Sequence, residues 1–174
     1  MRLHAAVPSL DLSDAYAHIE AAEAAASPQL TIELLLGVAF VESRFDPTAV
    51  SRVQGHTRRT GRYPSTAVPA QLDPRASLFC GPLQTIASSW LACLGMRDLK
   101  AAYAAGAAEL GEWLRDRRVR GNITRALAGH GCGNFGVVTG NCNGYPGRVL
   151  SMERQFRIGV DSRHATSRRA VANT

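Results

Sequence analysis

Apolar residues recur along most of this chain at the three- and four-residue spacing that gives an α-helix one apolar face. The pattern predicts six helices, and a strand is expected only in short pieces near Val137-Val138. The expected helices cover residues 14–26, 28–44, 82–94, 98–119, 122–128 and a stretch after residue 147. We therefore expect a mainly α fold with little or no sheet.

The segment 28–44 is apolar around most of its circumference, so we expect it to form the buried central helix. Ser27-Pro28 is a typical helix start, because proline is well tolerated at the first helical position. Asp46-Pro47 is expected to end this helix, since the residue before a proline disfavours the helical backbone.

Glu42 is the unusual residue of this predicted helix. It lies on the same stripe as Leu35, Val38 and Ala39, whereas Glu33 lies nearly opposite, where a solvent-facing charge is expected. An ionised carboxylate is costly in an apolar wall, so Glu42 is expected to keep its proton readily, as a general acid must. The alternative, left open by the residues alone, is that Glu42 ends the helix and reaches water.

Residues 52–79 form a long polar segment without clear periodicity. A stretch of this length in a compact domain is usually a functional loop or lid, and the alternative is a disordered surface insertion. Arg58, Arg59 and Arg62 within it could bind an anionic wall polymer or could simply be solvated. The residues 161–174 that end the chain are polar and basic, and we expect a flexible tail.

Length and composition are those of one ordinary globular domain: 174 residues, with 45% hydrophobic and 20% charged residues. The longest apolar run, residues 34–41, is too short to cross a membrane, so no insertion is expected. Residues 1–10 lack the apolar core of a signal peptide. The net charge of +6 favours anionic partners, but no arginine-rich run alternates with aromatic residues, so nucleic acid is not expected.

The four cysteines form two close pairs, Cys80 with Cys93 and Cys132 with Cys142, and neither pair makes a Cys-x-x-Cys motif. This spacing disfavours a zinc ribbon or a thioredoxin-like site and favours two local disulfides. Each would stabilise the fold by about 3 kcal/mol and would indicate an oxidising environment. Four reduced core cysteines remain the alternative.

The glycine-rich segment 129–147 contains Gly131-Cys-Gly-Asn-Phe-Gly136, a G-x-G-x-x-G match. It follows a predicted helix rather than a strand, so we reject a dinucleotide site and expect no cofactor. Glycine here would let the backbone approach packing neighbours or a ligand closely. His130 stands alone, without a second histidine at ligand spacing, so we expect a polar rim residue and no metal.

Four segments, in chain order, carry a resemblance to a known family. They are Ala39-Phe-Val-Glu-Ser-Arg-Phe-Asp-Pro-Thr-Ala-Val-Ser51, Cys80-Gly-Pro-Leu-Gln-Thr-Ile86, Ala126-Leu-Ala-Gly-His-Gly-Cys-Gly133 and Tyr145-Pro-Gly-Arg-Val-Leu150. Over residues 28–158 the chain resembles the lytic transglycosylases of the soluble-lytic, goose-lysozyme-like superfamily. The resemblance implies a lysozyme-like single domain over residues 1–160, whose buried central helix carries the catalytic glutamate.

The resemblance also implies roles for five residues of this sequence. Glu42 would be the single catalytic acid and base that cleaves the bond between N-acetylmuramic acid and N-acetylglucosamine and leaves a 1,6-anhydro end. Ser43 would hydrogen-bond near Glu42 or the substrate, Gln84 would contact an N-acetyl group, and Tyr145 would orient Glu42. His130-Gly131 replaces the family's Tyr-Asn, which places His130 among the cleft contacts.

The expected partner is therefore peptidoglycan, bound by a monomer that acts outside the cytoplasm. Without a signal peptide, delivery by phage lysis or on a virion is expected. Two other functions stay open. One is a hydrolytic lysozyme on the same fold, which usually needs a second carboxylate about 5–10 Å away. The other is a non-catalytic wall-binding or virion structural module.

Overall fold

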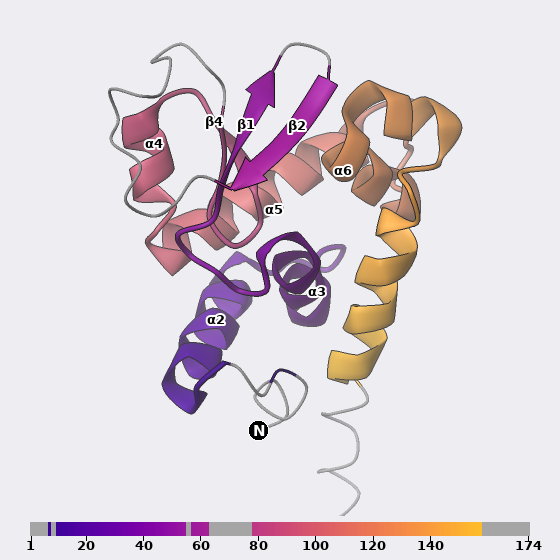
Figure 1. Cartoon of the computed structure of the whole chain (residues 1–174). Helices are drawn as coiled ribbons and strands as arrows, with labels where there is room; N and C mark the ends of the chain where they lie inside the picture. Colours follow the sequence, from indigo (N-terminus) through magenta and orange to yellow (C-terminus); the bar gives the residue numbers. More distant parts are fainter. Residues whose placement is uncertain (1–6, 8–9, 55–56, 63–77, 158–174) are drawn as a thin grey trace, which may run out of the picture.

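The computed structural model of the protein describes residues 7, 10–54, 57–62 and 78–157. The expectation of a mainly α fold is confirmed, and a small sheet accompanies the helices (Figure 1). The helices are α2 (Leu12–Ala25), α3 (Ile32–Ser43), α4 (Trp90–Gly95), α5 (Leu99–Arg115), α6 (Ile123–Thr139) and a last helix over residues 145–157. The predicted flexible tail at 161–174 lies outside the described residues.

The sheet, expected to be small or absent, is present and small. Four antiparallel strands pair in the order β2-β1-β3-β4. Their bounds are β1 (Val50–Gln54), β2 (Thr57–Arg62), β3 (Leu78–Cys80) and β4 (Thr85–Ala87). β3 is buried at every position, and β1 and β2 consist mostly of polar residues. None of these three strands therefore shows the period-two alternation by which a strand is recognised in a sequence. Residues 63–77 of the predicted loop, and the side chains of Arg58, Arg59 and Arg62, lie outside the described part.

The segment predicted as one helix from residue 82 to residue 94 is divided in the structure. Residues 81–84 form a turn in which Gly81 and Gln84 have positive φ angles of 70° and 51°. β4 follows, and α4 begins only after Ser89, whose side chain accepts a hydrogen bond from the Ala92 backbone nitrogen. Val137-Val138, the expected strand piece, lies within α6 instead.

α3 is the buried central helix that the sequence predicts. Every position from 34 to 39 is buried, but the helix is shorter than expected at both ends. Thr31, rather than Ser27-Pro28, caps its start by accepting a hydrogen bond from the Leu34 backbone nitrogen at 3.2 Å. It ends at Ser43 because Arg44 and Phe45 adopt the left-handed conformation, with φ angles of 61° and 67°.

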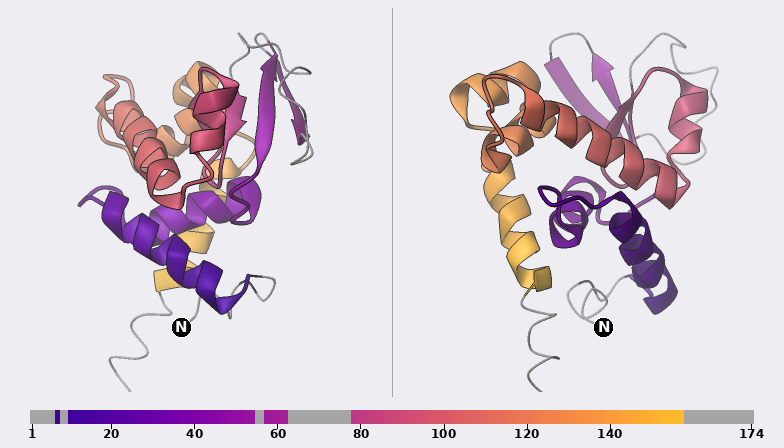
Figure 2. Two further views of the ribbon diagram at one scale, coloured as in Figure 1. Left: turned by 90° about the vertical axis from the view of Figure 1, so that its left-hand side faces the viewer. Right: turned by 180° about the vertical axis from the view of Figure 1, so that it is seen from behind.

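The other helices enclose α3 on several sides. In Figure 2, α5 crosses the back of the molecule and the helix 145–157 runs along one side of α3. Gly37 allows this last contact, because a Cβ atom at this position would lie 2.9 Å from the Val149 carbonyl oxygen. α2 packs against α5 and places buried His18 beside Tyr103. The sheet stands above the end of α3, between α4 and α6 (Figure 1).

His18 makes a testable contribution to the pH dependence of stability. Burial lowers the pKa of this imidazole to about 4, although a hydrogen bond with the Phe45 backbone and the charge of Asp14 act in the opposite direction. Between pH 6.5 and 4 the unfolded chain therefore binds a proton at residue 18 that the folded chain does not. We expect acidification through this window to lower the free energy of unfolding by about 3 kcal/mol through this residue.

The measurement is urea unfolding of the wild type and of His18→Gln at several pH values between 7 and 4. Carboxylates that titrate in this range act on both proteins, so the difference between the two curves isolates His18. We expect the variant to lose less stability than the wild type as the pH falls. Parallel curves would contradict a buried, neutral His18.

Candidate functional site

Glu42 lies in the last turn of α3, one residue before the helix ends. Above it on the same stripe, Leu35, Val38 and Ala39 are completely buried, as predicted. The Glu42 side chain itself is 16% exposed, so its carboxylate lies at the edge of the apolar wall rather than within it. The stripe is therefore apolar as expected, but it ends at Glu42 with a carboxylate that solvent can reach.

His130 extends from α6 toward Glu42. Its Nε2 atom lies 3.7 Å from Glu42 Oε1 and 3.1 Å from the Leu83 carbonyl oxygen. Its side chain is only 1% exposed, so the expectation of a polar rim residue is wrong. The reason is the course of α6, whose residues 126–131 are all buried and pack against α5 and the turn before β4.

Glu109 of α5 completes the group, and the sequence reasoning did not identify it. Its Oε1 atom lies 3.0 Å from His130 Nδ1, and its Oε2 atom accepts a hydrogen bond from the Ile86 backbone nitrogen at 3.3 Å. The sequence pattern could have indicated Glu109, because this residue lies on the same helical stripe as buried Ala102 and Gly106. Glu109, like Glu42, is therefore a carboxylate on an otherwise apolar helical stripe.

The partners of His130 indicate its protonation state. A carbonyl oxygen only accepts hydrogen bonds, so Nε2 donates to Leu83, and Nδ1 donates to Glu109 when that carboxylate is ionised. Both ring nitrogens carry a proton only in the imidazolium form. Burial lowers the pKa of His130, but the hydrogen bond and charge of Glu109, the charge of Glu42 and the Leu83 carbonyl outweigh it and raise the pKa. The contacts of His130 with two carboxylates and a carbonyl oxygen therefore favour its charged form.

Ser43, predicted to contact Glu42 or the substrate, is buried at the end of α3. Its hydroxyl group donates to the Pro82 carbonyl oxygen at 2.9 Å or to the Ala39 carbonyl oxygen at 3.2 Å, and it accepts from the Asp46 backbone nitrogen. These contacts join the end of α3 to the turn before β4. Ser43 thereby holds Glu42 and the Leu83 carbonyl oxygen, one residue after Pro82, in fixed relative positions.

Gln84, predicted to contact an N-acetyl group, is half-buried in that turn. Its Nε2 atom donates to the carbonyl oxygens of Ala49 and Gly81, and its Oε1 atom accepts from the Ser51 hydroxyl at 2.8 Å. These bonds connect the turn to the start of β1. The structure thus brings Gln84 to the same turn as Leu83, with its amide engaged by backbone and side-chain partners.

Tyr145, predicted to orient Glu42, is the first residue of the helix 145–157 and is buried. Its ring centroid lies 6.3 Å from that of His130. Gly131 permits this approach, because a Cβ atom there would lie 2.8 Å from Tyr145 Cδ1 and from Cys142 Sγ. Of the two roles considered for glycine in this segment, close packing is the one that occurs at this position.

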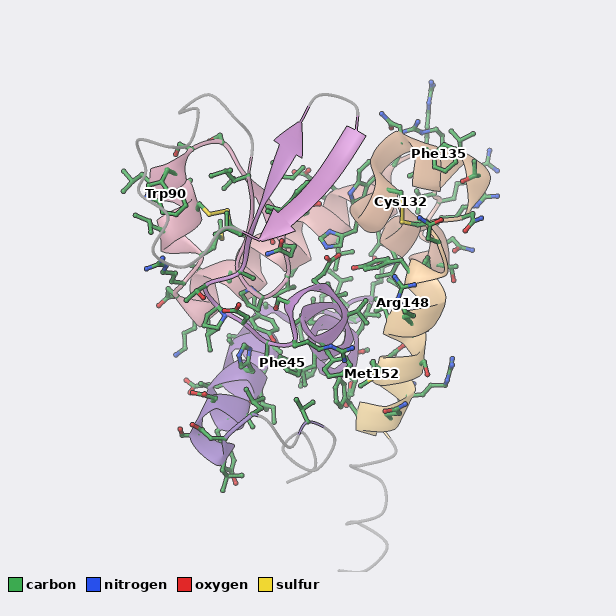
Figure 3. All side chains as sticks on the ribbon, in the orientation of Figure 1. Phe45, Trp90, Cys132, Phe135, Arg148 and Met152 are labelled. Carbon is green, nitrogen blue, oxygen red and sulfur yellow. A yellow bond between two sulfur atoms is a disulfide. The ribbon has the colours of Figure 1, made fainter. Side chains whose placement is uncertain are left out.

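Both predicted disulfides are present. Cys80 of β3 is bonded to Cys93 of α4, and Cys132 of α6 is bonded to Cys142. Figure 3 shows the second disulfide close to the junction of α6 with the helix that carries Arg148, whereas Trp90 of α4 lies on the other side of the molecule. The Cys132–Cys142 bond therefore links the segments that carry His130 and Tyr145.

Within the described part of the chain, no group of three or more histidine, cysteine or acidic side chains is arranged to hold a metal ion. The helices described there also include none that is long and apolar enough to cross a membrane. The site therefore consists of Glu42, His130 and Glu109, supported by the Leu83 carbonyl group and the Tyr145 ring. Such an arrangement can transfer a proton at Glu42 and place a fixed positive charge beside it.

Comparison of the chain with models of protein families, with curated proteins and with solved structures found no match.

Proposed function

We propose that the protein is a peptidoglycan lytic transglycosylase with a lysozyme-like fold. The observation that carries the proposal is the position of Glu42, a solvent-accessible carboxylate at the end of a buried helix, 3.7 Å from a buried histidine. The sequence motifs around Glu42, Gln84 and Tyr145 support the same conclusion, because their order resembles that of this family. Glu42, the turn 81–84 and Tyr145 all lie close to His130, which belongs to the third motif, so residues of all four motifs meet at one site.

In the proposed reaction, Glu42 donates its proton to the glycosidic oxygen as the bond from C1 of N-acetylmuramic acid to that oxygen breaks. The 6-hydroxyl oxygen of the same sugar then bonds to C1, and its proton passes to Glu42. The products are a free 4-hydroxyl group on N-acetylglucosamine and a 1,6-anhydro end on the muramic acid. Glu42 returns to its starting state, and no water is consumed.

The disulfides support action outside the cytoplasm, because such bonds persist in oxidising environments. The cell wall is such a place, and the net charge of +6 suits an anionic polymer. We propose further that the protein reaches the cell wall through phage lysis or on a virion.

Hydrolysis of the same bond is the second candidate, and Glu109 is the observation that favours it. Glu109 supplies a second carboxylate near Glu42, which the sequence alone did not offer. It borders a groove of about 480 Å³ between β4 and α5, through which water could reach it. Both of its oxygens already have hydrogen-bond partners, however, which favours an orienting role over activation of water.

Mass spectrometry of the products separates the two reactions. Purified cell walls are digested with the protein, and the released muropeptides are analysed without reduction. We expect muropeptides that end in 1,6-anhydro-muramic acid, 18 Da lighter than their hydrolysed counterparts because one water molecule (~18 Da) is not added. A product mixture with reducing ends alone would replace the transglycosylase proposal with lysozyme activity.

A further inference from the structure

Three titratable groups of the described chain face His130, each from a different element. They are Glu42 from α3, Glu109 from α5 and Tyr145 from the helix 145–157. The resemblance to the transglycosylases assigns no role to Glu109. Its contacts are nevertheless the shortest that His130 makes to any charged group among these residues, at 3.0 Å against 3.7 Å for Glu42.

We infer that Glu109 is a positioning residue that acts through His130 on Glu42, by holding the imidazole ring charged and directed at the catalytic carboxylate. This inference rests on the proposed function. Glu109 is itself held in place, because the Ile86 backbone nitrogen of β4 binds its second oxygen. The carboxylate therefore cannot turn away from His130 Nδ1 without losing that bond.

The orientation of the His130 ring is fixed by the hydrogen-bond partners of its two nitrogen atoms. With Nδ1 directed at Glu109, Nε2 is directed at the Leu83 carbonyl oxygen and lies 3.7 Å from Glu42 Oε1. The ring is almost completely shielded from water, so neither hydrogen bond competes with solvent. Removal of the Glu109 charge would take away one of the two carboxylates that favour the charged form of His130, so its second proton would be held less tightly.

The charge on His130 matters for the reaction because Glu42 becomes negative when it donates its proton. A fixed cation beside a developing negative charge stabilises that charge, and it does so most strongly where water is excluded. Glu109 itself touches no reacting atom in this scheme. Its loss should therefore slow the reaction without weakening the binding of peptidoglycan.

The test is Glu109→Gln, with Glu112→Gln as the matched control. Glu112 is an exposed glutamate three residues further along α5. We expect kcat for cell-wall clearance to fall by about 10- to 100-fold in Glu109→Gln, below the 10²–10⁴-fold that a general acid typically contributes, with KM little changed. We also expect the basic limb of its pH profile to move to lower pH. Glu109→Asp, which restores the charge, should recover part of the lost rate.

A second measurement tests the effect of Glu109 on the protonation of His130 directly and needs no substrate. The titration of the His130 ring is followed by nuclear magnetic resonance in isotope-labelled protein, with the signal assigned by its loss in His130→Gln. We expect the pKa of His130 to be lower in Glu109→Gln than in the wild type and unchanged in Glu112→Gln. Equal pKa values in the wild type and Glu109→Gln would overturn the inference.

The outcomes distinguish this inference from the proposed function. If the wild type clears cell walls and Glu109→Gln matches it in kcat and pH profile, the positioning role is overturned and the proposed function stands. If the wild type leaves cell walls intact, the proposed function is overturned, and the inference that rests on it is overturned as well. A fall in kcat together with a lowered His130 pKa supports the inference.

Discussion

Replacement of Glu42 by glutamine is expected to abolish most of the proposed activity, with a fall in kcat of about 10²–10⁴-fold. Glutamine keeps the size and shape of glutamate but has no proton to donate to the glycosidic oxygen. Because Glu42 is partly exposed at the edge of the core, we expect the fold to tolerate this change. The measurement is the rate at which a suspension of purified cell walls loses turbidity.

Glu33→Gln is the matched control for this experiment. It makes the same substitution in the first turn of the same helix, far from the end that carries Glu42. We expect wild-type clearance, with a stability loss of about 1 kcal/mol or less because a negative charge near a helix N-terminus is favourable. Thermal unfolding by circular dichroism should show all three proteins folded. If Glu42→Gln cleared the suspension as fast as the wild type, Glu42 could not be the acid, whereas clearance by neither protein would favour a non-catalytic wall-binding or virion module.

Replacement of Gly136 by alanine is expected to be the most destabilising change among those considered for this fold. A Cβ atom at Gly136 would overlap the carbonyl oxygen of Ala128, a backbone atom that cannot turn aside. The contact arises because α6 bends at Gly133, whose φ and ψ angles are 60° and −146°. Overpacking against backbone should lower the free energy of unfolding by about 3 kcal/mol or more.

Gly147→Ala provides the contrast, since a Cβ atom at Gly147 meets no atom within 4 Å and the residue lies in the helix 145–157. Alanine is the better helix former, so we expect a gain of roughly 0.5–1 kcal/mol. Urea unfolding of the wild type and both variants measures the two effects. A Gly136→Ala variant as stable as the wild type would contradict the bend in α6.

Much of the site could be predicted because its signals lie close together in the sequence. The apolar circumference of α3 identified the central helix, and the position of Glu42 on its stripe marked this carboxylate for attention. Cysteine spacings of 13 and 10 residues were enough to propose both disulfides, because two cysteines so close along the chain can readily meet. Helical periodicity likewise located α2 and α5 to within a few residues.

The sheet could not be predicted in the same way. Its strands are short, β1 and β2 are polar, and β3 is buried throughout, so these three lack the alternation that identifies a strand. Their stability comes from pairing between residues such as Val50 and Cys80, which lie 30 positions apart. The expected helix stopped at residue 128, although α6 continues to Thr139, for a related reason: the helical packing of Gly129, Gly131 and Gly136 depends on neighbours that glycine itself does not specify.

The sequence by itself marked Glu42 as the proposed acid and determined where the covalent cross-links form. Those conclusions depend on the spacing of nearby residues along the chain, which is the same in the folded and the unfolded protein. Only the tertiary structure decided what surrounds Glu42. His130 and Glu109 lie 21 residues apart on different helices, and His130 meets Leu83 across 47 residues. The contact of buried His130 with two carboxylates arises from the packing of α3, α5 and α6, because groups so distant in sequence interact strongly only when folding removes the water between them.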